Sequence, residues 1–103
     1  MRKIEPRDLI SEKALQDTIV QAAIRANWFA YHTHDSRRST PGFPDLVLLR
    51  GDQCLVYELK TARGRIRPEQ TAWLAAFNEA GIPARIVRPA DLDDVLQELG
   101  AAA

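Results

Sequence analysis

Two acidic residues and a lysine stand at the ends of two neighbouring apolar segments. Asp45 opens the first segment, and Glu58 and Lys60 close the second. A short polar stretch containing Gly-Asp, a usable hairpin turn, joins the segments, so residues 46–49 and 54–57 are predicted to be adjacent antiparallel strands. Side chains alternate along a strand, so Glu58 and Lys60 point the same way and can converge with Asp45.

These converging charges predict a site for a hard divalent cation. Charged groups at the ends of apolar strands cost free energy when they are buried without partners. A divalent cation offsets that cost, and Mg²⁺ in particular prefers oxygen ligands. Asp45 and Glu58 are therefore candidate metal ligands, with the ammonium group of Lys60 beside them.

Three short motifs carry a resemblance to a known family. Pro-Asp at 44–45, followed by Glu-Leu-Lys at 58–60, resembles the two-part signature of the PD-(D/E)xK nuclease superfamily. More narrowly, the chain resembles the VRR-NUC (virus-type replication-repair nuclease) domain in the motifs GFPDL at 42–46, ELKT at 58–61 and PEQ at 68–70. The resemblance extends over roughly residues 11–86.

The resemblance implies a fold and an activity. The fold is the restriction-endonuclease-like αβββαβ core, an α/β arrangement in which helices flank a mixed sheet. The activity is metal-dependent phosphodiester hydrolysis of DNA with Mg²⁺, for which Mn²⁺ should substitute. The implied metal ligands are Asp45, Glu58, Glu12 and the carbonyl of Leu59. Lys60 would position the attacking water or stabilise the transition state.

A first helix is predicted from Ser11, a plausible N-cap, to about Asn27, because apolar residues recur there at helical spacing. Glu12 and Gln16 border the buried stripe of this helix. An acid in the first turn also favours the positive end of the helix dipole, and on the sequence alone the two interpretations of Glu12 have equal weight. The family resemblance implies a metal-site glutamate on this helix and favours Glu12.

A second helix is predicted from Pro68, a residue suited to the first helical position, to Gly81. Gln70 borders its buried stripe near the end that meets Lys60. One interpretation is that Gln70 serves there only as a cap or backbone bridge. The family resemblance implies instead that it orients Lys60 or contacts the attacked phosphate.

Arginines cluster on both sides of the acidic pair. Residues 35–67 hold seven basic and four acidic residues, a net charge of +3, whereas the tail from Pro89 carries four acids and no base. A neutral chain can thus present a basic face to a nucleic acid. The alternative is that these residues only solubilise loops. The candidate phosphate-binding residues are Arg37, Arg38, Arg63, Arg65 and Arg67.

A strand is predicted over residues 28–33 and ends in His-Thr-His. Alternation places His32 and His34 on one face, where they could bind a borderline metal. Two ligands do not make a zinc site, and histidines at strand ends are more often hydrogen-bonded surface residues. A further strand is predicted over 84–88 and a closing amphipathic helix over 90–99.

The chain has 103 residues and no net charge, which predicts one globular domain and argues against a uniformly basic DNA-coating protein. Residues 1–10 are a charged lead-in and residues 11–100 the nuclease-like domain. The single cysteine, Cys54, can form no internal disulfide, and residues 1–10 do not resemble an export signal. We therefore expect the cytoplasm of a bacterium or of a phage-infected cell.

Two other functions stay open at this point: a DNA-binding module without cleavage, and a hydrolase of a small phosphate ester. A domain with one active site needs a second copy to cut both strands in one encounter, and small VRR-NUC proteins are similar in being dimers that cut four-way junctions. We expect a homodimer that cleaves branched DNA such as Holliday junctions; a monomeric flap or single-strand nuclease is the alternative. Candidate interface residues, where exposed, are Trp28, Phe29, Phe43 and Ile66.

Overall fold

The structure is a computed structural model that describes residues 5–34, 38 and 40–100. The elements occur in the order η1 (Pro6–Leu9), α1 (Glu12–Arg25), β1 (Phe29–His32), β2 (Leu46–Arg50), β3 (Gln53–Leu59), α2 (Pro68–Glu79), β4 (Ala84–Val87), η2 (Pro89–Asp91) and α3 (Leu92–Glu98). This order confirms the αβββαβ core. None of the helices in these ranges is long and apolar enough to cross a membrane.

The four strands form one mixed sheet in the order β1-β2-β3-β4. The pairs β1-β2 and β2-β3 are antiparallel, whereas β4 lies parallel to β3 after the α2 crossover. In the β2-β3 hairpin, Leu46 lies opposite Tyr57 and Arg50 opposite Gln53. The predicted hairpin is confirmed, with each strand slightly longer than its apolar run.

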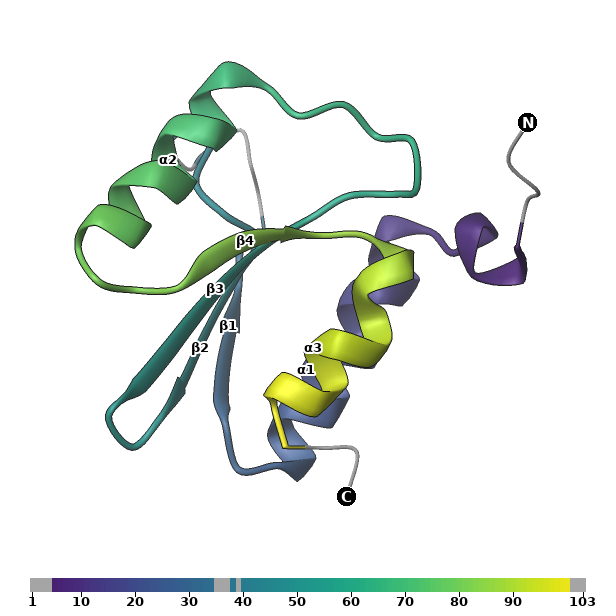
Figure 1. The fold of residues 1–103 in the computed structure, drawn as a ribbon, viewed down its shortest axis with the longest axis horizontal. Coiled ribbons are helices and arrows are strands. Elements are labelled where there is room, and N and C mark those ends of the chain that lie inside the picture. The colour runs from purple at the N-terminus through teal and green to yellow at the C-terminus, as the bar shows by residue number, and fades with distance from the viewer. Residues whose placement is uncertain (1–4, 35–37, 39, 101–103) are drawn as a thin grey trace.

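Helices cover both faces of the sheet (Figure 1). On one face, α1 packs on β1 and β3 and also against α3. Strand residues with their side chains on this face form the main core with Leu15 and Ile19 of α1. On the other face, α2 packs on β3 and β4 and leaves β1 and the outer part of β2 uncovered. The buried residues of the main core are Leu15, Ile19, Ala22, Ala23, Trp28, Leu46, Leu48, Leu55, Tyr57, Leu59, Val87, Val95 and Leu99.

The helix starts follow from local chemistry. Ser11 caps α1, because its hydroxyl accepts a hydrogen bond from the N–H of Ala14 at 3.0 Å. Pro68 occupies the first position of α2, where its missing N–H costs nothing. Gly81, after α2, adopts a φ of +86°, which suits a helix C-terminus. Both predicted helix starts are confirmed.

Arg50 ties the hairpin to two helix ends. Its Nη1 donates to the carbonyls of Ala26 and Leu99, at 3.0 and 3.1 Å. Its guanidinium also lies over the ring of Trp28, 4.4 Å from the centroid, and the Trp28 Nε1 donates to the Leu99 carbonyl at 3.0 Å. Carbonyls at helix ends lack partners within the helix, so Arg50 and Trp28 satisfy groups that the helices leave open.

Within the predicted lead-in, the structure describes residues 5–10. Residues Pro6–Leu9 form a short 3-10 turn, and Arg7 lies 3.6 Å from the carboxylate of Asp93 in α3. The division between a lead-in and a domain at residue 10 stays a prediction.

Candidate active site

The hairpin register brings the two carboxylates together. Leu46 and Tyr57 are paired, so Asp45 and Glu58 are the next opposed positions, and their side chains share the α2 face of the sheet. The Asp45 carboxylate accepts a hydrogen bond from the Leu59 N–H at 2.8 Å. The Asp45 carboxylate thus takes the position in the β2-β3 ladder that a backbone carbonyl would normally occupy. This bond fixes Asp45 against β3.

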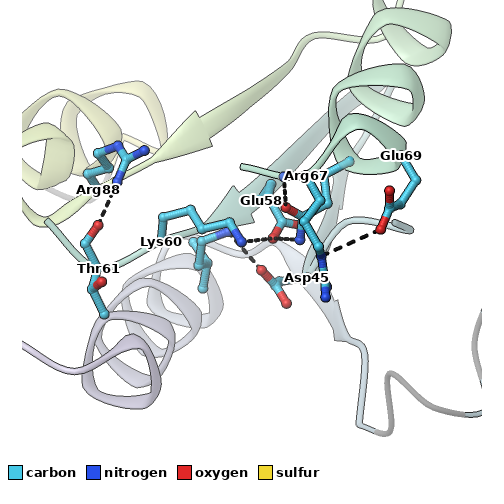
Figure 2. Close-up of polar contacts among 9 residues, drawn as sticks. Asp45, Glu58, Lys60, Thr61, Arg67, Glu69 and Arg88 are labelled. Carbon is cyan, nitrogen blue, oxygen red and sulfur yellow. Dashed lines mark hydrogen bonds and ion pairs between the residues drawn. The ribbon is translucent and has the colours of Figure 1, made fainter. Parts of the chain in front are cut away.

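Glu58 is buried, with 3% of its surface exposed. Its Oε2 accepts a hydrogen bond from Nε2 of Gln70 at 3.0 Å. The same oxygen lies 3.9 Å from Nζ of Lys60 (Figure 2). Burial, followed by the negative charge of Asp45, raises the pKa of Glu58 to about 8, while Lys60 acts in the opposite direction. The two carboxylates therefore form a pair in which the negative charge is only partly compensated.

Gln70 supports the Glu58 carboxylate from α2. Its side chain is buried, and its Oε1 accepts a hydrogen bond from the N–H of Arg67 at 2.9 Å. Because the amide oxygen is held by this N–H, the amide nitrogen must face Glu58. Gln70 therefore caps the start of α2, as one interpretation of the sequence had it, and also donates to Glu58. The other interpretation, in which Gln70 orients Lys60 or contacts the attacked phosphate, stays a prediction.

Lys60 is held at the start of the loop that leads to α2. Its side chain is only 12% exposed, and its N–H donates to the carbonyl of Val87 at 3.0 Å. The next residue is fixed by Arg88, whose Nη1 donates to the Thr61 carbonyl at 2.7 Å (Figure 2). Lys60 thus points at Glu58 from a backbone that is anchored on both sides.

Glu12 reaches the same place from α1. It lines a cavity of about 810 Å³ that also contains Asp45, Glu58, Lys60 and Gln70. Burial, and then the charge of Asp45, raises the pKa of Glu12. The predicted site residues from the hairpin and from both helices therefore face one cavity.

The donor set suits a hard cation that brings its own water ligands. Among residues 5–34, 38 and 40–100, no three His, Cys, Asp or Glu side chains are grouped closely enough to hold a metal by themselves. The close ligands are the carboxylates of Asp45 and Glu58. The N–H and C=O of one residue face the same neighbouring strand, so the Leu59 carbonyl lies on the Asp45 side of β3. Mg²⁺ is commonly bound by one or two carboxylates with several waters, which fits this set.

Comparison with known proteins agrees with this geometry. The family model described as "VRR-NUC domain" matches residues 5–91, which include every residue of the cavity. The chain belongs to the VRR-NUC family. A solved structure titled "VRR_NUC domain" is similar in fold, with a TM-score of 0.69 and 19% sequence identity over 84% of this chain and 94% of that chain. No curated protein sequence matches.

Membership of the VRR-NUC family makes this a nuclease-type domain. The matched region extends beyond the three motifs in both directions, from before α1 to the end of η2. It therefore includes Glu12, whose role the sequence alone left undecided. The mixed four-stranded sheet with helices on its faces is also shared with the similar solved structure.

The arginines surround the cavity of this VRR-NUC domain unequally. Arg65 and Arg67 line it, and Arg67 Nε also lies 3.5 Å from the Glu69 carboxylate (Figure 2). Arg63 and Arg38 are exposed, and Arg37 lies outside the described residues.

Sequence reasoning missed the contacts by which Gly42 and Thr33 position the segment that bears Asp45. Gly42 has a φ of +87°, and a Cβ built on it would lie 2.6 Å from the backbone of Glu69. The Thr33 N–H donates to the Asp45 carbonyl at 2.9 Å, and its hydroxyl donates to the Pro44 carbonyl at 3.0 Å. The glycine of the GFPDL motif was a usable signal for a close approach. Nothing in the sequence marks Thr33.

Proposed function

We propose that this VRR-NUC domain is a metal-dependent DNA endonuclease. The observation that carries the proposal is the Asp45–Glu58 pair on adjacent strands, with Lys60 Nζ 3.9 Å from Glu58. Nuclease-type domains of this family generally use a divalent metal. A Mg²⁺ or Mn²⁺ ion held by Asp45, Glu58, the Leu59 carbonyl and Glu12 would polarise the phosphate and lower the pKa of a bound water.

The residues of the chain supply the rest of the chemistry. Lys60 is mostly buried and carries a positive charge beside Glu58, so it can stabilise the charge that develops on the phosphate oxygens. Gln70 holds the Glu58 carboxylate in one orientation. Arg65 and Arg67 line the cavity and can bind phosphates on either side of the cut.

Plasmid nicking tests this function against its alternatives. With Mg²⁺, supercoiled plasmid should be converted to open circles, and EDTA should prevent the conversion. A DNA-binding module would retard the plasmid without cutting it. A hydrolase of small phosphate esters would cleave p-nitrophenyl phosphate and leave the plasmid intact.

Neutralising the cavity arginines one at a time should weaken DNA binding equally for all sequences. Each lost phosphate contact should reduce the slope of log K against log salt concentration by about one. We expect this for Arg65→Gln and Arg67→Gln, with Arg38, Arg63 and Arg37 tested in the same series. Fluorescence anisotropy of a labelled duplex between low and moderate salt measures the slope.

Arg25→Gln is the matched control for these variants, because Arg25 is exposed at the far end of α1. If the salt dependence of DNA binding is unchanged in all five variants, these arginines do not contact phosphates and are only solvated loop residues.

We further propose that the domain acts as a homodimer on branched DNA such as Holliday junctions. The uncovered part of the sheet carries exposed apolar side chains: Phe29 is 80% exposed, Tyr31 58% and Leu49 48%. Phe29 and Leu49 are directly paired, and β1 is an edge strand. Such a patch on an open edge suits a second copy related by a two-fold axis.

The structure shows which of the four candidate interface residues are exposed. Trp28 is buried in the main core, and Phe43 packs edge-on against Trp73, with ring centroids 5.1 Å apart. Phe29 and Ile66 are exposed, so both remain candidates for the interface. The proposed interface therefore centres on Phe29.

Phe29→Asp is expected to convert a dimer into a monomer. A charge in the centre of an apolar interface is costly to bury, so the variant should sediment as a monomer at micromolar concentration. It should also nick a four-way junction without pairing the two cuts. Ile24→Asp is the control, because Ile24 is 59% exposed and belongs to α1, which packs on the opposite face of the sheet. A wild-type chain that sediments only as a monomer and makes unpaired nicks would favour a flap or single-strand nuclease.

A further inference from the structure

A second hollow adjoins the candidate active site on the α1 side. Its volume is about 390 Å³, and α1 and the end of β1 line it. Four residues line both hollows: Lys13, Gln16, Thr33 and His34. The two hollows therefore form one continuous groove, which leads from the Asp45–Glu58 pair to His32.

The far end of this groove is rich in hydrogen-bond donors. The rings of His32 and His34 lie with their centroids 4.1 Å apart, and His34 is exposed. An imidazole keeps at least one N–H donor in either protonation state. The Lys13 side chain is 81% exposed and pairs with Asp17 at 2.8 Å. An exposed ion pair of this kind contributes little free energy, so the ammonium group stays available to another anion.

The histidine pair is fixed relative to the active site. His32 is paired with Leu46 in the β1-β2 ladder. The following residue, Thr33, makes two hydrogen bonds to the backbone carbonyls that flank the Pro44-Asp45 bond. A ligand bound to the histidines is therefore held at a set position from the Asp45 carboxylate.

The geometry points to a second nucleic-acid subsite. His32, His34 and Lys13 bind the sugar-phosphate backbone of the DNA strand next to the bond that is cut. This inference rests on the proposed nuclease function. A phosphate suits the groove better than a metal ion, because the described residues there provide no third His, Cys, Asp or Glu ligand grouped with the histidines.

The double variant His32→Ala/His34→Ala tests the subsite on two substrates. One is supercoiled plasmid, and the other is thymidine 5′-(p-nitrophenyl phosphate), which has a single phosphate and so lacks the neighbouring phosphate that the subsite would bind. For plasmid, KM should rise about tenfold with kcat nearly unchanged, because hydrogen bonds to a charged phosphate are lost outside the reacting centre. For the small ester, kcat/KM should not change.

Anisotropy in EDTA with a labelled single-stranded oligonucleotide separates this inference from the nuclease function. The double variant should bind about tenfold more weakly than the wild type, whether or not the protein cuts. The control is Gln97→Ala, an exposed residue of α3. Equal losses on both substrates would mean that the histidines only support Asp45 and would overturn the subsite. Unchanged oligonucleotide binding would overturn it too. If the wild type cuts neither substrate and the double variant still binds the oligonucleotide more weakly, the nuclease function is refuted and the subsite is retained.

Discussion

Replacing Glu58 by glutamine is expected to abolish cleavage and, in EDTA, to make the fold more stable. Glutamine keeps the size of the side chain and an oxygen that can accept the Gln70 hydrogen bond, but it removes the charge. Plasmid cleavage should fall by about a hundredfold to a thousandfold. Asp45→Asn and Lys60→Ala should lose cleavage as well, with the fold and much of the DNA binding intact.

The gain in stability follows from the position of the Glu58 pKa. Burial and the charge of Asp45 raise it from 4.5 to about 8, so the folded chain holds this proton more tightly than the unfolded chain. The stability from protonated Glu58 is fully present below pH 4.5 and is lost as pH rises through about 8. At a pH of about 8, Glu58→Gln should be more stable than the wild type by about 1–3 kcal/mol.

Urea unfolding in EDTA at several pH values measures this difference, which should grow with pH. Glu79→Gln, an exposed acid of α2, is the matched control and should change neither stability nor cleavage. Full activity in Glu58→Gln, Asp45→Asn or Lys60→Ala would overturn the assignment of the active site.

Replacing Gly42 by alanine is expected to destabilise the domain and to reduce cleavage. Its φ of +87° is unfavourable for any residue with a Cβ, and the added carbon would lie 2.6 Å from the Glu69 backbone. Strain and overpacking together should cost about 2–4 kcal/mol. The clash would also push the segment that bears Asp45 away from α2, so cleavage should fall along with stability.

Gly51→Ala separates the two effects. Gly51 also has a positive φ, of +59°, but a Cβ there would meet nothing within 4 Å. This control should cost only about 1 kcal/mol and leave cleavage unchanged. Thermal unfolding of both variants makes the comparison. Equal destabilisation of the two would show that the contact with Glu69 has no energetic weight.

The central part of the site could be predicted because it depends on one hairpin. Alternation along two adjacent strands is enough to bring Asp45 and Glu58 to one face, and a short turn fixes the register. The helix starts were predictable for the same kind of reason: the Ser11 hydroxyl bonds to a backbone N–H three residues on, and Pro68 lacks an N–H where the helix needs none. Such local chemistry can be identified without knowing the packing.

Other parts of the site depend on how distant elements pack and could not be predicted. The hydrogen bond from Gln70 to Glu58 depends on where α2 lies on the sheet, and the sequence does not show that position. The Thr33 hydrogen bonds join segments that the sequence separates by a polar loop. The exposure of Phe29 and the burial of Trp28 were likewise undecided, because neighbouring aromatic residues at a strand start give no sign of which face is covered.

The Arg50 contacts described for the fold have a consequence for how the domain opens. The Arg50 side chain donates hydrogen bonds to carbonyls at the C-terminal ends of both α1 and α3, and Trp28 donates to one of the same carbonyls. Neither helix end can fray without leaving Arg50 partly unpaired, so the two ends should loosen together and behave as one unit in local unfolding. The end of α1 that bears Glu12 lies a full helix length from the Arg50 contacts. Loosening of these two helix ends can therefore occur while the end of the sheet that bears Asp45 and Glu58 stays ordered.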